Sequence, residues 1–312
     1  MLDQTVAFAP RGTFAFKPQD RKAMPAPGSV VGMILSLIVV GAAIYQARDL
    51  DFAMILGLVP TSLTFWCLFA VSYLAGPASE WFIFQRLWGV GASAFGVLIR
   101  KLIYNELLVG YLGEAYFYGW ARRNLKFVTS PFGAVKDVAV LSAVAGNAAT
   151  LVFVAVAFPF MRLMPLYAHA IAIGCSLAVM IGTSLAVMLL RRSIFSLERK
   201  ELKMVFTVHL FRILTTALLS AALWHLVLPD VPLGWWLVLV TIRLLISRLP
   251  FVPNKDVVFA GVAVLALGDQ VAISALMTLM AGMILAAHVL VGLSLALADL
   301  LSGGRSNETL AL

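Results

Sequence analysis

Charged side chains that fall inside apolar segments are the residues of this sequence most able to do chemistry. Nine side chains share this setting: Arg100, Lys101, Glu106, Glu114, Arg212, Arg243, Arg248, Lys255 and Asp256. A charge within hydrocarbon costs at least about 2–3 kcal/mol on insertion scales, so it normally faces a polar cavity or a partner. Six of the nine are basic and three are acidic. This excess predicts a net positive cavity, which suits an anionic headgroup and above all a phosphate.

Eight residues are predicted to bind the substrate. They are Asn105, Glu106, Glu114, Arg212, Arg243, Arg248, Asn254 and Lys255. We expect the bases Arg243, Arg248 and Lys255 to hold the anion. Glu106 and Glu114 are expected to pair with those bases in the empty site, or to handle a cation or a proton.

Glu106 and Glu114 are eight positions apart, which predicts that they share one face of a helix. For Arg100, Lys101 and Arg243 an alternative stays open, in which the charged end of each side chain reaches the membrane interface instead of a cavity.

Sequence motifs of known catalytic or metal sites are absent. The chain has no HExxH, CxxC, Walker or GxSxG pattern, and its four histidines share no ligand spacing. The two cysteines, Cys67 and Cys175, lie in apolar runs and show no metal spacing. We therefore expect no catalytic residue, no metal and no cofactor.

The composition identifies the setting of these charges. Of 312 residues, 62% are hydrophobic and 12% are charged, about half the roughly 25% usual for soluble domains. Mean hydropathy is +0.98. These values exclude a soluble enzyme and a nucleic-acid-binding domain, so the net charge of +8 does not indicate a nucleic-acid partner. Apolar runs of about twenty residues predict an all-α polytopic membrane protein.

Hydropathy divides the chain into tails, clean spans and broken stretches. Polar tails are expected at 1–28 and 302–312, with a single transmembrane domain at 29–301 between them. About six full spans are predicted, at 29–47, 52–75 (ended by Gly76-Pro77), 138–161, 166–190, 204–228 and 270–298. The stretches 81–121 and 233–267 are interrupted by charges, and the second also by prolines, which predicts two re-entrant helical hairpins. The alternative is eight ordinary spans.

The basic residues predict the orientation. If both hairpins enter and leave on one side, 15 of the 23 Lys and Arg residues lie in cytoplasmic segments, and only Arg48 and Arg162 lie outside. This bias places both termini in the cytoplasm, and we expect a bacterial inner membrane. The order span, span, hairpin, span then occurs twice with opposite direction. Inverted repeats of this kind form binding sites near the midplane, although the two halves share no residue-level similarity.

Three passages resemble one known family. They are Asn105-Glu106…Gly113-Glu114 followed by Arg122-Arg123, the pair Lys136-Asp137 at the start of a span, and Leu249-Pro250…Pro253-Asn254-Lys255-Asp256. Together with the span order, they resemble the lysylphosphatidylglycerol synthase transmembrane-region-like family of flippase-like integral membrane proteins. The chain departs from the family pattern because the proline before Gly113-Glu114 is missing and Asn254-Lys255 replaces a glycine-rich turn.

The resemblance implies that the protein moves a lipid between leaflets or supports lipid remodelling. No aminoacyl transfer is expected, because only a short tail follows residue 301. Two alternatives remain, namely a membrane-embedded enzyme acting on a lipid or isoprenoid phosphate, and a non-catalytic partner in an envelope assembly. The expected partner is a membrane lipid with an anionic headgroup, and homo- or hetero-oligomers stay open.

Overall fold

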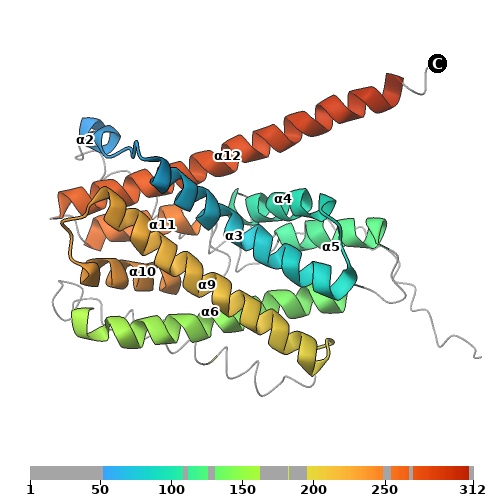
Figure 1. Cartoon of the computed structure of the whole chain (residues 1–312), viewed down its shortest axis with the longest axis horizontal. Helices are drawn as coiled ribbons and strands as arrows, with labels where there is room; N and C mark the ends of the chain where they lie inside the picture. Colours follow the sequence, from blue (N-terminus) through green and yellow to red (C-terminus); the bar gives the residue numbers. More distant parts are fainter. Residues whose placement is uncertain are drawn as a thin grey trace, which may run out of the picture.

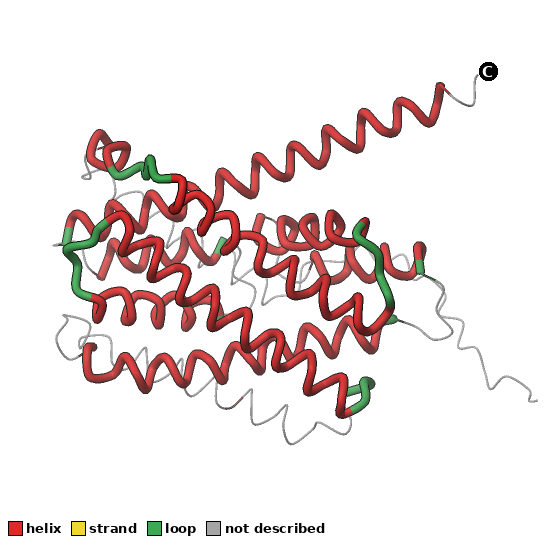
Figure 2. The backbone as a smooth tube through the Cα atoms, viewed as in Figure 1, coloured by secondary structure: helices red, strands yellow, loops and turns green. Residues whose placement is uncertain are grey.

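The structure, a computed structural model, describes residues 52–107, 112–125, 131–161, 182, 195–248, 254–266 and 270–308. Over these residues the chain forms α-helices and no strand (Figure 2). The predicted all-α class is therefore confirmed. The predicted span at 29–47, and all of the span at 166–190 except residue 182, lie outside the described residues.

Nine helices cover the described chain (Figure 1). They are α2 (Phe52–Gly57), α3 (Leu63–Trp88), α4 (Ser93–Leu107), α5 (Leu112–Asn124), α6 (Phe132–Met161), α9 (Arg199–Val227), α10 (Leu233–Ser247), α11 (Lys255–Ala266) and α12 (Val271–Glu308). Among them, α3, α6, α9 and α12 are long and apolar enough to cross a membrane. These four candidate spans agree with a membrane protein.

The predicted end of the second span at Gly76-Pro77 is wrong. Helix α3 continues through Pro77 as far as Trp88. A proline removes one backbone hydrogen bond, and packing against neighbouring helices can carry a membrane helix through that defect. The helix ends instead at Gly89, whose φ of 65° is the left-handed conformation that glycine adopts without strain.

Each broken stretch consists of two short helices. The stretch 81–121 contains α4 and α5, of 15 and 13 residues, and the stretch 233–267 contains α10 and α11, of 15 and 12 residues. At 1.5 Å per residue these helices are roughly 18–23 Å long, which is shorter than the ~30 Å hydrocarbon core. The predicted re-entrant hairpins stay a prediction, because helix length does not fix how a pair meets a membrane.

The helices occur twice in the order long, short, short, long. Helices α3 to α6 form the first set and α9 to α12 the second. In Figure 1, α3 and α9 run in opposite directions, and so do α6 and α12. The pair α4 and α5 lies toward one end of the bundle, and the pair α10 and α11 lies toward the other end.

Apolar side chains fill the bundle and also cover its outside. The larger core includes Trp236, Phe259 and Leu276, and contacts run between α6 and α9, α3 and α9, and α11 and α12. Large apolar side chains such as Phe211 and Leu290 are 72% and 64% exposed. Such faces fit lipid as the surrounding solvent.

The expected polar tail at 302–312 begins inside a helix. Helix α12 continues through Glu308, and its C-terminal half projects beyond the bundle in Figure 1. No proline interrupts the chain between Ala298 and Glu308, so the helix extends past the apolar segment although Gly303 and Gly304 have low helix propensity.

Candidate functional site

The two broken stretches contact each other at their tips. The backbone N–H of Asn254, just before α11, donates to the backbone carbonyl of Glu106 near the end of α4 (3.1 Å). Asn254 has a φ of 47°, a left-handed conformation that asparagine tolerates better than most residues. The Glu106 carboxylate faces the backbone N–H of Lys255 at the start of α11.

Pro250 and Pro253 cannot lie within a regular helix without loss of backbone hydrogen bonds, which predicts a non-helical segment at 250–256. The structure ends this segment earlier than predicted. Asn254 is non-helical, as expected, but Lys255 and Asp256 already belong to α11. The asparagine carbonyl accepts from the N–H groups of Val257 and Val258, which starts the helix at that point. Residues 249–253 lie outside the described residues.

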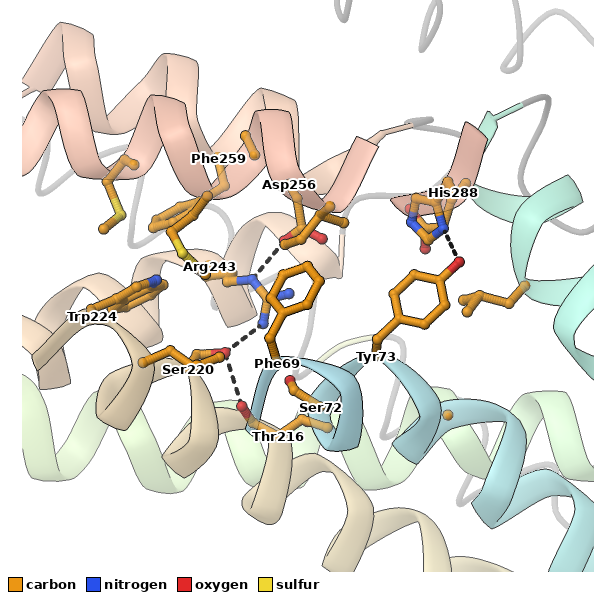
Figure 3. A pocket seen from close by; sticks show the side chains of 18 of the residues that line it. Phe69, Ser72, Tyr73, Thr216, Ser220, Trp224, Arg243, Asp256, Phe259 and His288 are labelled. Atoms are coloured by element: carbon orange, nitrogen blue, oxygen red, sulfur yellow. Dashed lines mark hydrogen bonds and ion pairs between the residues drawn. The ribbon is translucent and has the colours of Figure 1, made fainter. Parts of the chain in front are cut away.

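A cavity of about 200 Å³ lies beside these tips, lined by residues of α3, α4, α9, α10, α11 and α12 (Figure 3). Its charged lining is Glu106, Arg212, Arg243 and Asp256. Hydroxyl groups add to the polar part, and aromatic and methionine side chains form an apolar wall. The cavity can therefore accommodate a polar group and an apolar group together.

Arg243 lies at the centre of a polar chain that links three helices. Its Nε donates to Asp256 Oδ1 at 2.6 Å, and its Nη1 donates to Ser220 Oγ at 3.2 Å. Ser220 in turn donates to the carbonyl of Thr216 (2.9 Å). Figure 3 shows this chain crossing the cavity. Arg243 thus faces the interior, and the interface alternative does not hold for it.

A second link joins α3 and α12 across the cavity. The Tyr73 hydroxyl and His288 Nδ1 lie 3.0 Å apart, and their rings are in contact. Both residues line the cavity (Figure 3). This side-chain contact links α12 to α3 beside the charged groups.

A separate buried cluster surrounds Lys101. Its Nζ lies 2.7 Å from Glu80 Oε1 and 3.4 Å from Glu114 Oε1. Asn105 donates from Nδ2 to Glu114 Oε1 (3.2 Å) and accepts from the N–H of Gly113 (2.8 Å). Lys101 is only 4% exposed, so it does not reach an interface.

The prediction that Glu106 and Glu114 share one helix face is wrong. Helix α4 ends at Leu107 and α5 begins at Leu112, so the two glutamates belong to different helices. Helix α5 packs on α4, and Glu114 then contacts Lys101, whereas Glu106 lies near Lys255 and Arg243.

Arg248 and Lys255 lie beside the cavity rather than in its lining. The Arg248 guanidinium donates twice to Ser247 Oγ, at 3.0 and 2.7 Å, and packs so closely on α6 that a Cβ on Gly146 would collide with it. Lys255 Nζ donates to the Ser247 carbonyl (2.9 Å) and acts electrostatically on Glu106.

The structure therefore divides the eight predicted site residues into three groups. Glu106, Arg212 and Arg243 line the cavity. Asn254, Lys255 and Arg248 lie around the tip of α10 and α11, while Asn105 and Glu114 belong to the Lys101 cluster. The cavity lining holds two arginines and two carboxylates, so the predicted excess of positive charge is not present there.

Glu80, Tyr73 and the hydroxyl groups of α9 are not among the predicted site residues, although the structure places them at the cavity or beside Lys101. Glu80 falls where the second span was expected to have ended, so it was not counted among the embedded charges. The hydroxyl groups of α9 could have been predicted from the sequence. Arg212, Thr216 and Ser220 are spaced four apart, so they form a polar stripe on one helix face.

Within the part of the chain that the structure describes, no group of three His, Cys, Asp or Glu side chains could hold a metal ion. No protein-family model, curated protein or solved structure matches this chain. The family resemblance drawn from the sequence therefore stays a prediction.

Proposed function

We propose that this protein is a lipid translocase-like protein of the bacterial inner membrane, with both termini in the cytoplasm. An anionic lipid headgroup, free or lipid-linked, would pass through the cavity while the acyl chains stay in the surrounding lipid. The observation that carries this proposal is a cavity with four charged side chains, enclosed by helices whose outer faces are apolar.

Moving a lipid headgroup from one leaflet to the other has a high free-energy cost. A charged group crossing bare hydrocarbon loses its hydration, and that cost keeps lipids in their leaflet. The cavity supplies guanidinium, carboxylate and hydroxyl groups that can replace water around a headgroup. Its apolar wall, with Trp224 and Phe259, can contact the glycerol region.

The second part of the proposal is that α4–α5 and α10–α11 are re-entrant hairpins of inverted repeats. Three observations support this part. The four helices are short, and the two pairs lie toward opposite ends of the bundle. Their tips also contact each other through Asn254 and Glu106. Inverted hairpins whose tips meet place a binding site at mid-depth, where both leaflets can reach it in turn.

Leaflet transfer in vesicles tests this function. Purified protein is reconstituted with a trace of phosphatidylglycerol carrying a fluorescent acyl chain, and dithionite is added outside. In protein-free vesicles only the outer-leaflet probe is bleached. We expect bleaching of the inner-leaflet probe as well when the protein is present. Identical bleaching with and without protein, at verified incorporation, would refute translocation.

A further inference from the structure

The embedded bases differ in whether they already have a counter-ion. Arg243 is ion-paired with Asp256, and Lys101 with Glu80 and Glu114. Each of these bases is neutralised inside the protein, so neither needs an external anion. A ligand that displaced such a partner would leave a buried carboxylate uncompensated, which is costly.

Arg212 is different although it lines the same cavity. Its Nη2 donates to Ser142 Oγ at 3.1 Å, whereas its Nε is buried and has no hydrogen-bond partner. Among the described residues no carboxylate forms an ion pair with it. The carboxylate that acts on it through space is Glu80, and Lys101 holds that group at 2.7 Å.

The guanidinium of Arg212, which lines the cavity without a carboxylate partner among the described residues, matches one ligand chemistry. A guanidinium presents five N–H donors in a planar fork, which can engage two oxygens of a phosphate at once. A base within a membrane protein that lacks an internal counter-ion is expected to face an external one. A hydroxyl such as that of Ser142 supplies no negative charge.

The position of Arg212 also suits an amphiphile. Arg212, Thr216, Ser220 and Trp224 are spaced four apart and line the cavity along α9. At 1.5 Å per residue this wall is about 18 Å long. Arg212 lies at one end of it, and Trp224 lies at the other with Phe259 stacked on it.

We propose that Arg212 is the anion-binding group of the cavity and that its ligand is a phosphate or phosphodiester group. This inference rests on the proposed function where it takes that phosphate to be a phospholipid headgroup. Arg243 then has a positioning role, because it holds Asp256 of α11 and Ser220 of α9 in place rather than binding the ligand.

Binding to delipidated protein, measured by native mass spectrometry in detergent, tests the inference. The probes are phosphatidylglycerol, diacylglycerol with the same acyl chains, and inorganic phosphate as a competitor. We expect Arg212→Gln to weaken phosphatidylglycerol binding by about tenfold or more, as for a lost charged hydrogen bond. The matched control is Arg199→Gln, an exposed position on the same helix, and it should bind like the wild type.

The inference is overturned if folded Arg212→Gln binds phosphatidylglycerol as tightly as the wild type. If that variant does not fold, Arg212→Lys decides, because a lysine lacks the planar fork and should bind severalfold more weakly; unchanged affinity overturns the inference. Wild-type protein that binds diacylglycerol as well as phosphatidylglycerol overturns it irrespective of any variant.

Competition separates the two sources of phosphate. Displacement of phosphatidylglycerol by inorganic phosphate supports a site for the free anion, and phosphatidylglycerol binding that inorganic phosphate does not displace supports a lipid site. Arg212-dependent binding without leaflet transfer would sustain this inference and refute the proposed function. Leaflet transfer that is unchanged in folded Arg212→Gln would refute this inference and leave the proposed function standing.

Discussion

At the scale of single residues, the charges in the bundle are organised as partners rather than as a pool of positive charge. Arg243 lies against Asp256, and Lys101 lies between Glu80 and Glu114. Most of these side chains can be identified from the sequence because charges inside apolar runs are conspicuous. Their partners cannot, since pairing depends on how α10 packs on α11 and how α3, α4 and α5 pack together.

The pair Arg243 and Asp256 should show a measurable coupling energy. Arg243→Ala and Asp256→Ala each remove the 2.6 Å contact, so the double variant should lose about 1–3 kcal/mol less than the sum of the two single losses. Unfolding by SDS in mixed micelles, followed by circular dichroism, gives the three free energies. Strictly additive losses would show that the pair contributes nothing.

Removal of the Lys101 charge should destabilise the protein strongly. Lys101→Met leaves the Glu80 and Glu114 carboxylates without their base, which should cost about 3 kcal/mol. The added change Glu80→Gln should recover part of that loss because it removes one of the two charges. Lys200→Met, at an exposed position of α9, is the control. Equal stability of the Lys101 and Lys200 variants would contradict this view of the cluster.

At the scale of elements, close backbone approaches decide how the short helices pair. A Cβ on Gly113 would collide with the carbonyl oxygen of Lys101 and with the side chain of Asn105. The same glycine donates its N–H to Asn105 Oδ1. Glycine at this position lets α5 pack directly on α4 and so brings Glu114 to Lys101.

A matched pair of glycine substitutions on α5 tests this contact. Gly113→Ala should destabilise the protein by about 1–3 kcal/mol through overpacking. Gly119→Ala should be neutral or stabilising by up to about 1 kcal/mol, because nothing lies within 4 Å of its Cβ position. Thermal unfolding in detergent compares the two. Similar melting temperatures would show that α4 and α5 can separate without cost.

Asp137 joins the start of α6 to the segment before α9. Its Oδ2 accepts from the N–H groups of Ser196 and Leu197, at 2.6 and 2.8 Å, and the residue is fully buried. Asp137→Ala should therefore cost about 2 kcal/mol and expose this segment to limited proteolysis. Asp230→Ala, at an exposed position, should leave the cleavage pattern unchanged. The reverse pattern would contradict a tethering role for Asp137.

At the scale of the whole molecule, the sequence predicted the all-α class better than the boundaries of individual helices. Long apolar runs identify α6 and α9 because a span needs about twenty residues. The predicted end of the second span is too early because Gly76-Pro77 is locally typical of a helix end, whereas buried residues on both sides of it, such as Phe65 and Phe84, hold α3 as one helix. The cavity combines α9 with α10, α11 and α12, and no local pattern predicts which faces of distant helices meet.

The orientation of the chain has its own test. A bias of fifteen cytoplasmic bases to two predicts that the C-terminal end of α12 lies in the cytoplasm. In a variant without Cys67 and Cys175, Arg305→Cys should react with an impermeant maleimide only after the cells are permeabilised. Ready labelling of intact cells would reverse the topology and the proposed direction of both hairpins.

Passage of a lipid headgroup through the cavity is tested most directly by two tryptophan substitutions on α3. Ser72 lines the cavity and Ala70 is exposed on the outer surface of the same helix. Ser72→Trp should fill the cavity and abolish leaflet transfer of labelled phosphatidylglycerol in vesicles, whereas Ala70→Trp should transfer it like the wild type. Equal transfer by the two folded variants would show that lipid crosses elsewhere and would contradict a route through this cavity.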